Sequence, residues 1–228
     1  MNQLNISDGF VRLDASMADD ESVINSARVS FAKQSQLHSE LTGADKGLIK
    51  FLMREHHGTP FEHNAFRFHV KCPVFVAREW FRHRIGSFNE FSARYSEVPN
   101  EFFTPDESAI RTQVGKPGAY TFEPVDEALA KSTVEMISAV NKKAYETYAH
   151  LVESGVAKEV ARMVLPVSMY TQFYWTVNAR SLMNFLALRT DMNAQREIRE
   201  FAEAVEKLFA EQMPETWKAW VEFGKVCP

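Results

Sequence analysis

The feature that most constrains the fold is a helical pattern over residues 125–153. Apolar residues recur there at steps of three and four, which is the period of an α-helix with one apolar face. Gly155 follows as a residue that favours the end of a helix. The pattern predicts a helix-rich protein, and the simplest place for the apolar face is the core of one oligomer rather than a separate partner helix. The apolar positions are Leu129, Met136, Ile137, Val140, Ala144, Tyr148 and Leu151.

Two segments carry the pattern of a strand. Over residues 66–72 apolar residues alternate with polar ones, as in a strand with one buried face. Residues 167–177 are rich in β-branched and aromatic residues, which favour strands. The predicted fold class is therefore α+β, a helix-rich domain with a small, mostly antiparallel sheet. The expected helices cover residues 19–31, 42–57, 74–85 (with Val74, Ala77, Phe81 and Ile85 buried), 158–165, 180–188, 193–212 and 214–223, and a long surface loop is expected over 105–124.

Length and charge limit the number of domains and the class of partner. At about 150 residues per domain, 228 residues predict a single domain over residues 1–228. The chain has 26 basic and 30 acidic residues, and this net charge of −4 argues against nucleic acid as a partner. Cys72 and Cys227 make no disulfide framework, and no apolar run approaches a membrane span or a signal peptide. We therefore expect a reduced, cytoplasmic protein without a membrane partner.

An arginine-rich segment, residues 82–95, has the composition of a phosphate site. It holds three arginines, a histidine, two serines and an asparagine where the expected helix runs out into a loop. Guanidinium groups bind phosphate bidentately, and hydroxyls and loop amides can complete the shell. The alternative is a solvated basic surface paired with carboxylates such as Glu79 and Glu90.

The spacing inside this segment favours the first interpretation. The pattern Arg-His-Arg-x-x-Ser-x-x-x-x-Ser-x-Arg, with six fixed positions over thirteen residues, resembles the signature of the flavin-dependent thymidylate synthases. The similarity continues along the chain at residues 28–31, 59–63, 75–78, 161–162, 165–166 and 178–189. The six signature positions are filled by Arg82, His83, Arg84, Ser87, Ser92 and Arg94.

The resemblance implies an activity and an assembly. It implies a homotetramer with active sites at subunit interfaces, which binds FAD and takes dUMP, methylenetetrahydrofolate and NADPH as its small-molecule partners. The methylene carbon would pass to C5 of the uracil, and FAD reduced by NADPH would supply the hydride that makes it a methyl group. No covalent cysteine nucleophile is implied, and the placement of Cys72 and Cys227 agrees, since neither has a recognisable activating neighbour.

The resemblance also carries site residues onto this chain, position by position. Arg189 matches the catalytic residue placed at the uracil ring, and His57 matches one on the folate and flavin side. Positions that match FAD contacts are Thr59, Arg82, His83, Arg84, Glu90, Asn178, Arg180 and Asn184. Positions that match dUMP contacts are Glu79, Arg82, Phe91, Ser92, Ala93, Arg94, Arg162 and Arg189.

The role implied for Arg189 has a chemical reason. C5 of uracil is a weak nucleophile, and negative charge builds on the ring as the N3 proton is lost. A guanidinium fixed at the O2/N3 edge stabilises that charge, so Arg189 would replace covalent activation. The alternative is that Arg189 is a helix-end arginine paired with Asp191.

Two departures from the family pattern keep other activities open. Glu79 stands where many relatives have glutamine, so it either points away from the expected phosphate or is neutralised by Arg78 and Arg82. Asn193 stands where some relatives have a histidine beside the flavin. The rival functions are a related enzyme that methylates or hydroxymethylates another pyrimidine nucleotide, and a non-enzymatic nucleotide or nucleic-acid binding module.

A metal site is not expected. His56, His57, His63, His69 and Cys72 lie close in sequence, but they are distributed over a helix end, a loop and a strand. They contain neither a CxxC pair nor an HExxH motif, which are the spacings that predict zinc.

Overall fold

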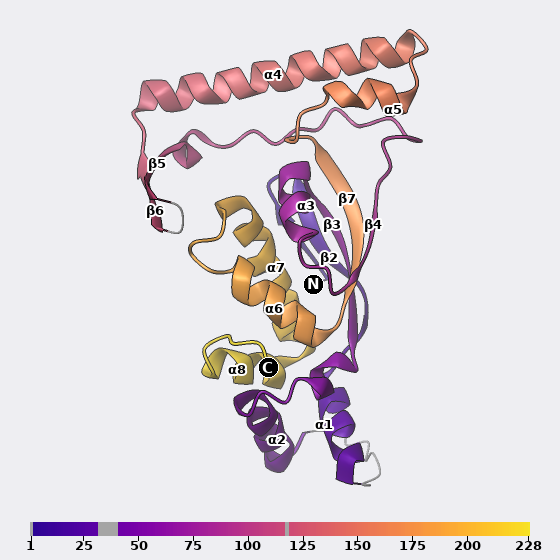
Figure 1. Cartoon of the computed structure of the whole chain (residues 1–228), viewed down its shortest axis with the longest axis vertical. Coiled ribbons are helices and arrows are strands. Elements are labelled where there is room, and N and C mark those ends of the chain that lie inside the picture. The colour runs from indigo at the N-terminus through magenta and orange to yellow at the C-terminus, as the bar shows by residue number, and fades with distance from the viewer. Residues whose placement is uncertain (1, 32–40, 117–118) are drawn as a thin grey trace. The chain divides into compact units, whose positions relative to one another are not determined.

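The structure is a computed structural model that describes residues 2–31, 41–116 and 119–228 (Figure 1). Its contacts divide these residues into two compact units. Unit 1 takes the described residues of 1–72, 76–90 and 172–228, and unit 2 takes those of 73–75 and 91–171. The prediction of a single domain over residues 1–228 stays a prediction.

Unit 1 contains a five-stranded sheet in the order β1-β2-β3-β7-β4. The pairs β1–β2, β2–β3 and β4–β7 are antiparallel. The predicted strands over 66–72 and 167–177 are confirmed as β3 and β7, whereas β1, β2 and β4 had not been predicted. The bounds are β1 Gln3–Ile6, β2 Gly9–Met17, β3 Ala65–Pro73, β4 Ser87–Glu90 and β7 Tyr170–Val177.

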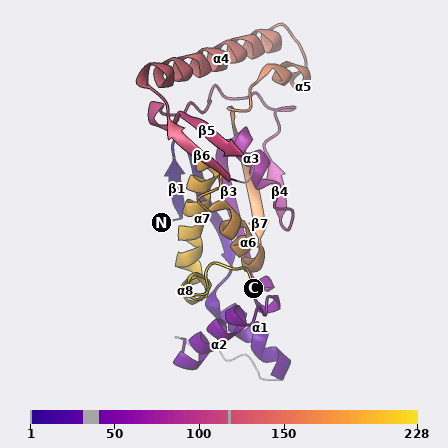
Figure 2. The ribbon, with the colours of Figure 1, turned by 60° about the vertical axis from the view of Figure 1, so that its left-hand side comes forward.

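The core of unit 1 is aromatic. The alternation over residues 66–72 is confirmed, because Phe66, Phe68, Val70 and Cys72 are fully buried. Figure 2 shows α7 beside the sheet, and α7 packs against β1 and β2. From β7, Trp175 lies 5.7 Å from Phe68, measured between ring centroids. The apolar side of β7 is therefore part of the core.

Helices cover most of the remaining residues of unit 1. The helical predictions over 19–31, 42–57, 180–188, 193–212 and 214–223 are confirmed within a few residues. α6 and α7 pack on each other, and α8 packs on α2 and α7. The elements are α1 Asp20–Arg28, η1 Val29–Phe31, α2 Gly43–Arg54, η2 Thr59–Glu62, α6 Ala179–Arg189, α7 Arg196–Gln212 and α8 Pro214–Glu222.

The helix predicted over 74–85 is shorter, and α3 covers only Val74–Trp80. The backbone tightens after Trp80, where Arg82 N donates to Glu79 O and His83 N donates to Trp80 O. Such i→i−3 bonds end an α-helix. The placement of Ile85 on a buried face was wrong, because Ile85 is 75% exposed.

Unit 2 contains the long helix and a hairpin. The helix predicted from 125 to 153 is confirmed as α4, Glu127–Glu153, and the one predicted over 158–165 as α5, Lys158–Ala161, followed by η4, Arg162–Val164. The loop predicted over 105–124 was wrong for most of its length, because it holds η3, Glu107–Ala109, and the antiparallel pair β5, Arg111–Lys116, and β6, Ala119–Pro124. Every described residue of this hairpin is exposed, so no buried face gave it an alternating pattern.

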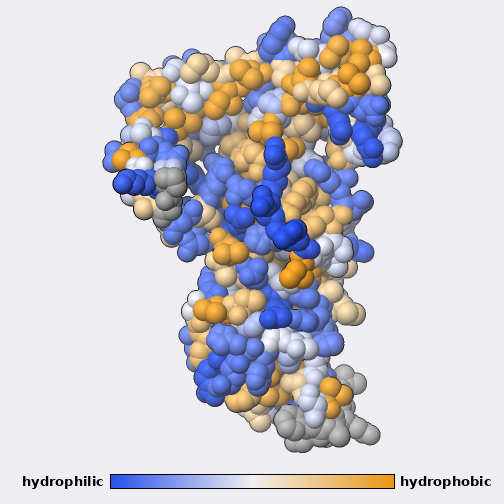
Figure 3. Space-filling view, in the orientation of Figure 1, coloured by the Kyte–Doolittle hydropathy of each residue, from blue (hydrophilic) through white to orange (hydrophobic). Residues whose placement is uncertain are grey.

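The apolar face of α4 is only partly buried within unit 2. Tyr148 is 2% exposed and its hydroxyl accepts a hydrogen bond from Val98 N. In contrast, Leu129, Met136 and Val140 are 48%, 59% and 60% exposed, and apolar residues are visible along the surface of α4 in Figure 3. The carboxyl-terminal half of the stripe therefore packs within unit 2, and burial of its amino-terminal half in the core of an oligomer stays a prediction. No helix among the described residues combines the length and apolar character needed to cross a membrane.

Candidate active site

A cavity of about 660 Å³ in unit 1 collects most of the residues expected to bind FAD. It lies between the turn that follows α3 and the exposed side of α6. Two segments that are distant in sequence, 82–85 and 178–189, supply most of its walls. The lining residues are Glu62, Arg82, His83, Arg84, Ile85, Asn178, Arg180, Ser181, Asn184, Leu188, Arg189 and Cys227.

The sequence of α6 explains why its polar residues face the cavity. Leu182, Met183 and Phe185 are fully buried against the core, so residues 180, 184 and 188, one turn apart, lie on the opposite face. The helix begins at Asn178, whose Oδ1 accepts from Ser181 N at 2.8 Å. This cap stabilises the end of the helix from which Arg180 extends.

A buried asparagine fixes the same helix end from outside. Asn64 Oδ1 accepts a hydrogen bond from Ala179 N at 2.8 Å, and Asn64 is only 2% exposed. Its Nδ2 is buried without a partner among the described residues. Sequence reasoning missed Asn64, because a single asparagine before a strand carries no signal of its own.

Arg82 and Arg84 are unpaired cations at the cavity. Both side chains are exposed, and neither makes a hydrogen bond or an ion pair with the described residues. An unpaired guanidinium keeps its donors available for an anion, and two of them suit a phosphate or pyrophosphate. Arg82 and Arg84 are therefore not neutralised by Glu79 or Glu90, as the alternative of a solvated basic surface required.

Arg189 is the most constrained arginine of the cavity. Its Nε donates to His83 Nε2 at 3.0 Å, its Nη1 to Glu79 Oε2 at 3.1 Å, and its Nη2 to Glu79 O at 3.3 Å. Asp191 accepts from Asn193 instead. The alternative in which Arg189 pairs with Asp191 is therefore excluded, and Glu79 is neutralised by Arg189 rather than by Arg78 and Arg82.

These contacts determine the protonation of His83. Burial and the neighbouring Arg189 cation lower the pKa of His83 to about 4. The ring is therefore neutral at neutral pH, and its Nε2 accepts the proton of Arg189 Nε. Burial raises the pKa of Glu79, with Arg189 opposing that shift and Glu197 adding to it.

Arg180 joins three segments at the edge of the cavity. Its Nη1 donates to Glu62 Oε1 at 2.5 Å and its Nε to Pro228 O at 2.7 Å. Gly58 packs directly beneath the guanidinium. The neighbours of Gly58, His57 and Thr59, are both exposed, and the His57 ring packs edge-on against Phe51 with centroids 5.6 Å apart. His57, the residue expected on the folate side, is thus next in sequence to Gly58, which packs against Arg180.

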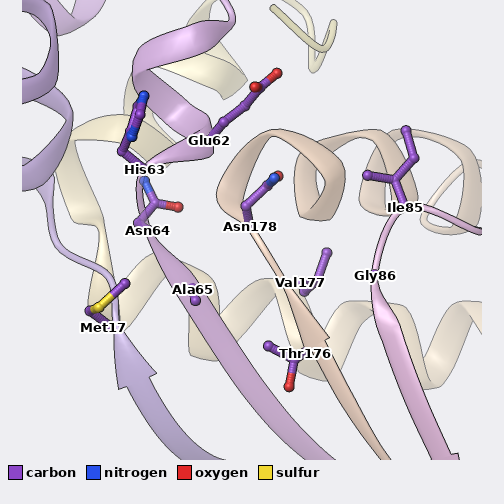
Figure 4. A pocket seen from close by; sticks show the side chains of 10 residues that line it. All are labelled: Met17, Glu62, His63, Asn64, Ala65, Ile85, Gly86, Thr176, Val177 and Asn178. Atoms are coloured by element: carbon purple, nitrogen blue, oxygen red, sulfur yellow. The ribbon is translucent and has the colours of Figure 1, made fainter.

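A second cavity of about 490 Å³ adjoins the first, since Glu62, Ile85 and Asn178 line both. It lies where β2 and β7 end and β3 begins, with Asn64 and Asn178 labelled between Met17 on one side and Ile85 on the other (Figure 4). The sequence had placed Asn178 at the FAD site but had not predicted this cavity, which combines polar groups with two exposed apolar side chains. Besides those five residues it is lined by His63, Ala65, Gly86, Thr176 and Val177.

The residues expected at the dUMP phosphate lie in unit 2. Ala93 and Ala161 belong to one buried cluster with Val98 and Tyr148, and Phe91 packs against it. Arg94 and Arg162 follow directly on these two alanines and are exposed, so the cluster positions the backbone from which both arginines extend. The Arg94 guanidinium lies 4.9 Å from the ring centroid of Tyr95. Ser92 and Arg94 are thus on one short turn. Glu90, the residue before Phe91, is the last residue of β4 and pairs with Phe173 of β7.

Cys72 lies in the core of unit 1, and Cys227 lines the cavity beside Arg180, whose cation opposes the effect of burial on the pKa of Cys227. Cys72 is completely buried, and burial raises its pKa well above the ordinary value of a thiol. Burial also raises the pKa of Cys227, whose thiol donates to Arg180 O at 3.3 Å. Thiolates, not thiols, are the reactive form. In the described part of the chain, no cluster of three or more His, Cys, Asp or Glu side chains is arranged to hold a metal ion.

Comparison with known proteins identifies the family. Residues 12–215 match the family model described as thymidylate synthase complementing protein. The chain belongs to this family. Among its relatives, the flavin-dependent thymidylate synthase of Thermosipho africanus is 48% identical over 95% of this chain and 92% of its own length. That of Tropheryma whipplei strain TW08/27 is 42% identical over 100% and 98%.

Solved structures agree with this membership. The UMP/dUMP methylase PolB of Streptomyces cacaoi, bound with 5-Br dUMP, is 43% identical, with a TM-score of 0.90 over 97% of this chain and 98% of its own. The same enzyme bound with 5-Br UMP gives a TM-score of 0.88 over 98% of each chain. The resemblance inferred from the Arg82 to Arg94 signature is thereby confirmed as family membership.

Proposed function

We propose that this protein is a flavin-dependent thymidylate synthase, which converts dUMP into dTMP with methylenetetrahydrofolate as the carbon donor and NADPH as the reductant. The observation that carries the proposal is the cavity in which segments 82–84 and 178–184 meet. Both segments match FAD contacts of the family, and they are almost a hundred residues apart in the chain. Relatives that are named for this activity align over nearly the full length of the chain.

The cavity fits a flavin dinucleotide. Arg82 and Arg84 supply two cations that no carboxylate of the described chain neutralises, which suits the two charges of a pyrophosphate. Asn178, Arg180 and Asn184 supply further donors on the facing helix. FAD bound there would supply hydride chemistry that no side chain of this protein offers. Thr59 and Glu90 complete the residues that would hold it.

Arg189 acts on the nucleotide. Its cation lies at the cavity wall with 22% of its side chain exposed, so it meets a ligand in a partly water-excluded setting where charge stabilisation is strong. At the O2/N3 edge of uracil the guanidinium stabilises the negative charge that appears when the N3 proton leaves, which activates C5. The His83 ring accepts a hydrogen bond from Arg189. Because this ring is neutral, it adds no charge of its own beside the uracil.

The nucleotide is held by cations rather than by a covalent bond. Ser92, Arg94 and Arg162 bind the phosphate of dUMP, together with Ala93 and Phe91 beside them. Because Cys72 is buried and protonated, it does not add to the ring, and Cys227 is a thiol of raised pKa. The reaction therefore proceeds without a cysteine nucleophile, with His57 on the side of the folate.

We also propose a homotetramer. The exposed apolar residues Leu129, Met136 and Val140 recur at steps of seven and four on α4, which places them on one face. An exposed apolar stripe of this kind is typical of a subunit interface. Light scattering coupled to size exclusion tests the assembly, and a monomer at micromolar concentration would contradict it.

A second candidate follows from one observation. The structurally similar PolB is named as a UMP/dUMP methylase and was solved with analogues of both nucleotides. This chain could likewise methylate UMP or another pyrimidine nucleotide. Turnover measured side by side with dUMP, UMP and dCMP separates the candidates, and a clear preference for UMP or dCMP would replace the first.

The experiment that tests the proposed function is the visible absorption of the purified protein reconstituted with FAD. We expect a flavin spectrum that bleaches when NADPH is added without oxygen and returns when dUMP and methylenetetrahydrofolate follow. A protein that binds no FAD, or one whose reduced flavin does not respond to the two substrates, would contradict the proposal.

A further inference from the structure

The guanidinium of Arg189 is held by two residues of a single turn. Glu79 accepts from Nη1 through its carboxylate and from Nη2 through its backbone carbonyl, and His83 accepts from Nε. A guanidinium has five N–H donors, so these three hydrogen bonds leave two donors unused. The unused donors belong to Nη1 and Nη2, one on each.

The carboxylate that holds Arg189 is behind it rather than in front of it. In the described part of the chain Arg189 and His83 line the cavity of about 660 Å³, whereas Glu79 is not among the lining residues. A ligand in the cavity would therefore meet Arg189 and not Glu79. This arrangement favours the option that Glu79 points away from the bound nucleotide.

The turn that carries Glu79 is rigidly supported. Trp80, the next residue, is fully buried and stacks on Phe185 of α6 with ring centroids 4.7 Å apart. Phe185 is one turn before Arg189 on the same helix, and its ring also packs against His83 at 4.9 Å. The acceptors and the guanidinium are thus fixed to one aromatic cluster, which limits their relative movement.

We propose that Glu79 is a positioning residue which, with His83, holds the guanidinium of Arg189 at the cavity wall in the orientation that meets the nucleotide. The expected change in turnover rests on the proposed function. The expected change in the orientation of Arg189 rests only on its hydrogen bonds. The proposal also gives a reason for the acid at this position. The carboxylate of Glu79 holds the guanidinium from outside the cavity lining, and the neutral His83 accepts a third hydrogen bond without adding a charge.

Two variants of Glu79 separate orientation from charge. Glu79→Ala removes the side-chain acceptor of Nη1, so the guanidinium is free to turn. Glu79→Gln keeps an oxygen at that place and removes only the charge. Glu200→Gln is the matched control, because Glu200 pairs with Arg196 at 2.9 Å on α7 and also loses one negative charge, away from the cavity.

The first measurement is kcat and KM for dUMP with FAD-loaded enzyme. We expect Glu79→Ala to lower kcat by about 10- to 100-fold, since a misplacement of about 1 Å can cost about 100-fold. We expect Glu79→Gln to rescue most of kcat, Glu200→Gln to leave it unchanged, and the Kd of FAD to be the same in all proteins. A Glu79→Ala enzyme with the kcat of the wild type, or one that loses FAD in parallel with activity, would overturn the proposal.

The second measurement follows Arg189 without turnover, through the NMR titration of His83, whose signal is identified by its loss in His83→Gln. Burial and the Arg189 cation lower the pKa of His83 to about 4. If Glu79→Ala releases the guanidinium, this pKa rises toward the usual value, while Glu79→Gln keeps it low. An unchanged His83 pKa in Glu79→Ala overturns the proposal even if kcat falls. If the wild type makes no dTMP, the proposed function fails and this titration still decides the position of Arg189.

Discussion

Gly58 lies against the guanidinium of Arg180 so closely that a Cβ at residue 58 would stand 2.5 Å from Nε. The same Cβ would stand 2.8 Å from Pro228 O, which is the acceptor of that Nε. Glycine at 58 is therefore required by close approach, and it links the segment of His57 and Thr59 to the start of α6.

The first prediction concerns this contact. Gly58→Ala should push Arg180 away from Glu62 and Pro228, lower the free energy of unfolding by about 1–3 kcal/mol, as overpacking does, and weaken FAD binding. Urea denaturation and FAD titration measure the two effects. Gly47→Ala is the control, because no atom lies within 4 Å of a Cβ there, and alanine in a helix should stabilise by about 0.5–1 kcal/mol. Equal stability of the two variants would contradict the close approach.

The second prediction concerns Arg189. Arg189→Ala should keep FAD and lose dTMP formation by a factor on the order of 100 to 1,000, since that is the usual effect of removing one preorganised donor. Arg189→Lys should recover little, because an ammonium cannot donate to both Glu79 and His83 and still present a fork. Single-turnover methyl transfer with pre-reduced enzyme isolates this step. Rates within a few-fold of the wild type would remove Arg189 from the chemistry.

The third prediction is that the thiols are dispensable. The double variant Cys72→Ala, Cys227→Ala should form dTMP from dUMP at close to the wild-type rate. Cys72→Ala should cost about 1 kcal/mol of stability, because it leaves a small cavity in a buried face. Turnover is measured on folded, FAD-loaded protein. Complete loss of turnover in such a preparation would point to covalent catalysis.

The fourth prediction concerns the acid stability of unit 1. Asp45 is 1% exposed, caps α2 with Thr42 and pairs with Arg28. The Thr42 hydroxyl and amide and the Arg28 cation lower its pKa below the ordinary 3.8. A lowered native pKa contributes stability above the unfolded pKa and loses it as pH falls through the native value.

Asp45→Asn tests this effect. The difference in free energy of unfolding between wild type and Asp45→Asn should be largest near neutral pH and should shrink as the pH falls below about 4. Denaturation of both proteins across this range measures it, with the exposed Asp8→Asn as the control. A difference that does not change with pH would contradict the ionic contribution of Asp45.

The sequence predicted the elements whose apolar residues repeat with the period of a strand or of a helix. The alternation of Phe66 to Cys72 and the apolar repeat of residues 125–153 each require one kind of element, and β3 and α4 are where they were expected. The hairpin of β5 and β6 could not be predicted in this way, because every described residue of it is exposed and no face needed an apolar pattern.

The sequence could predict which residues gather at the site, but it could not predict the hydrogen bonds between them. The family resemblance placed Arg82, His83 and Arg189 in one site, and the structure brings them to one cavity. It could not say that Arg189 is held by Glu79, since that contact depends on how far α3 extends before its last turn tightens. Asn64 gave no signal because its role, to accept from Ala179 N, exists only after β3 and α6 have packed.

The most direct test of the central claim is a single turnover of the FAD-loaded protein, reduced beforehand and mixed without oxygen with dUMP and methylenetetrahydrofolate. We predict that each reduced flavin that is reoxidised yields one dTMP. Flavin that stays reduced, or flavin that is reoxidised without dTMP, would contradict it.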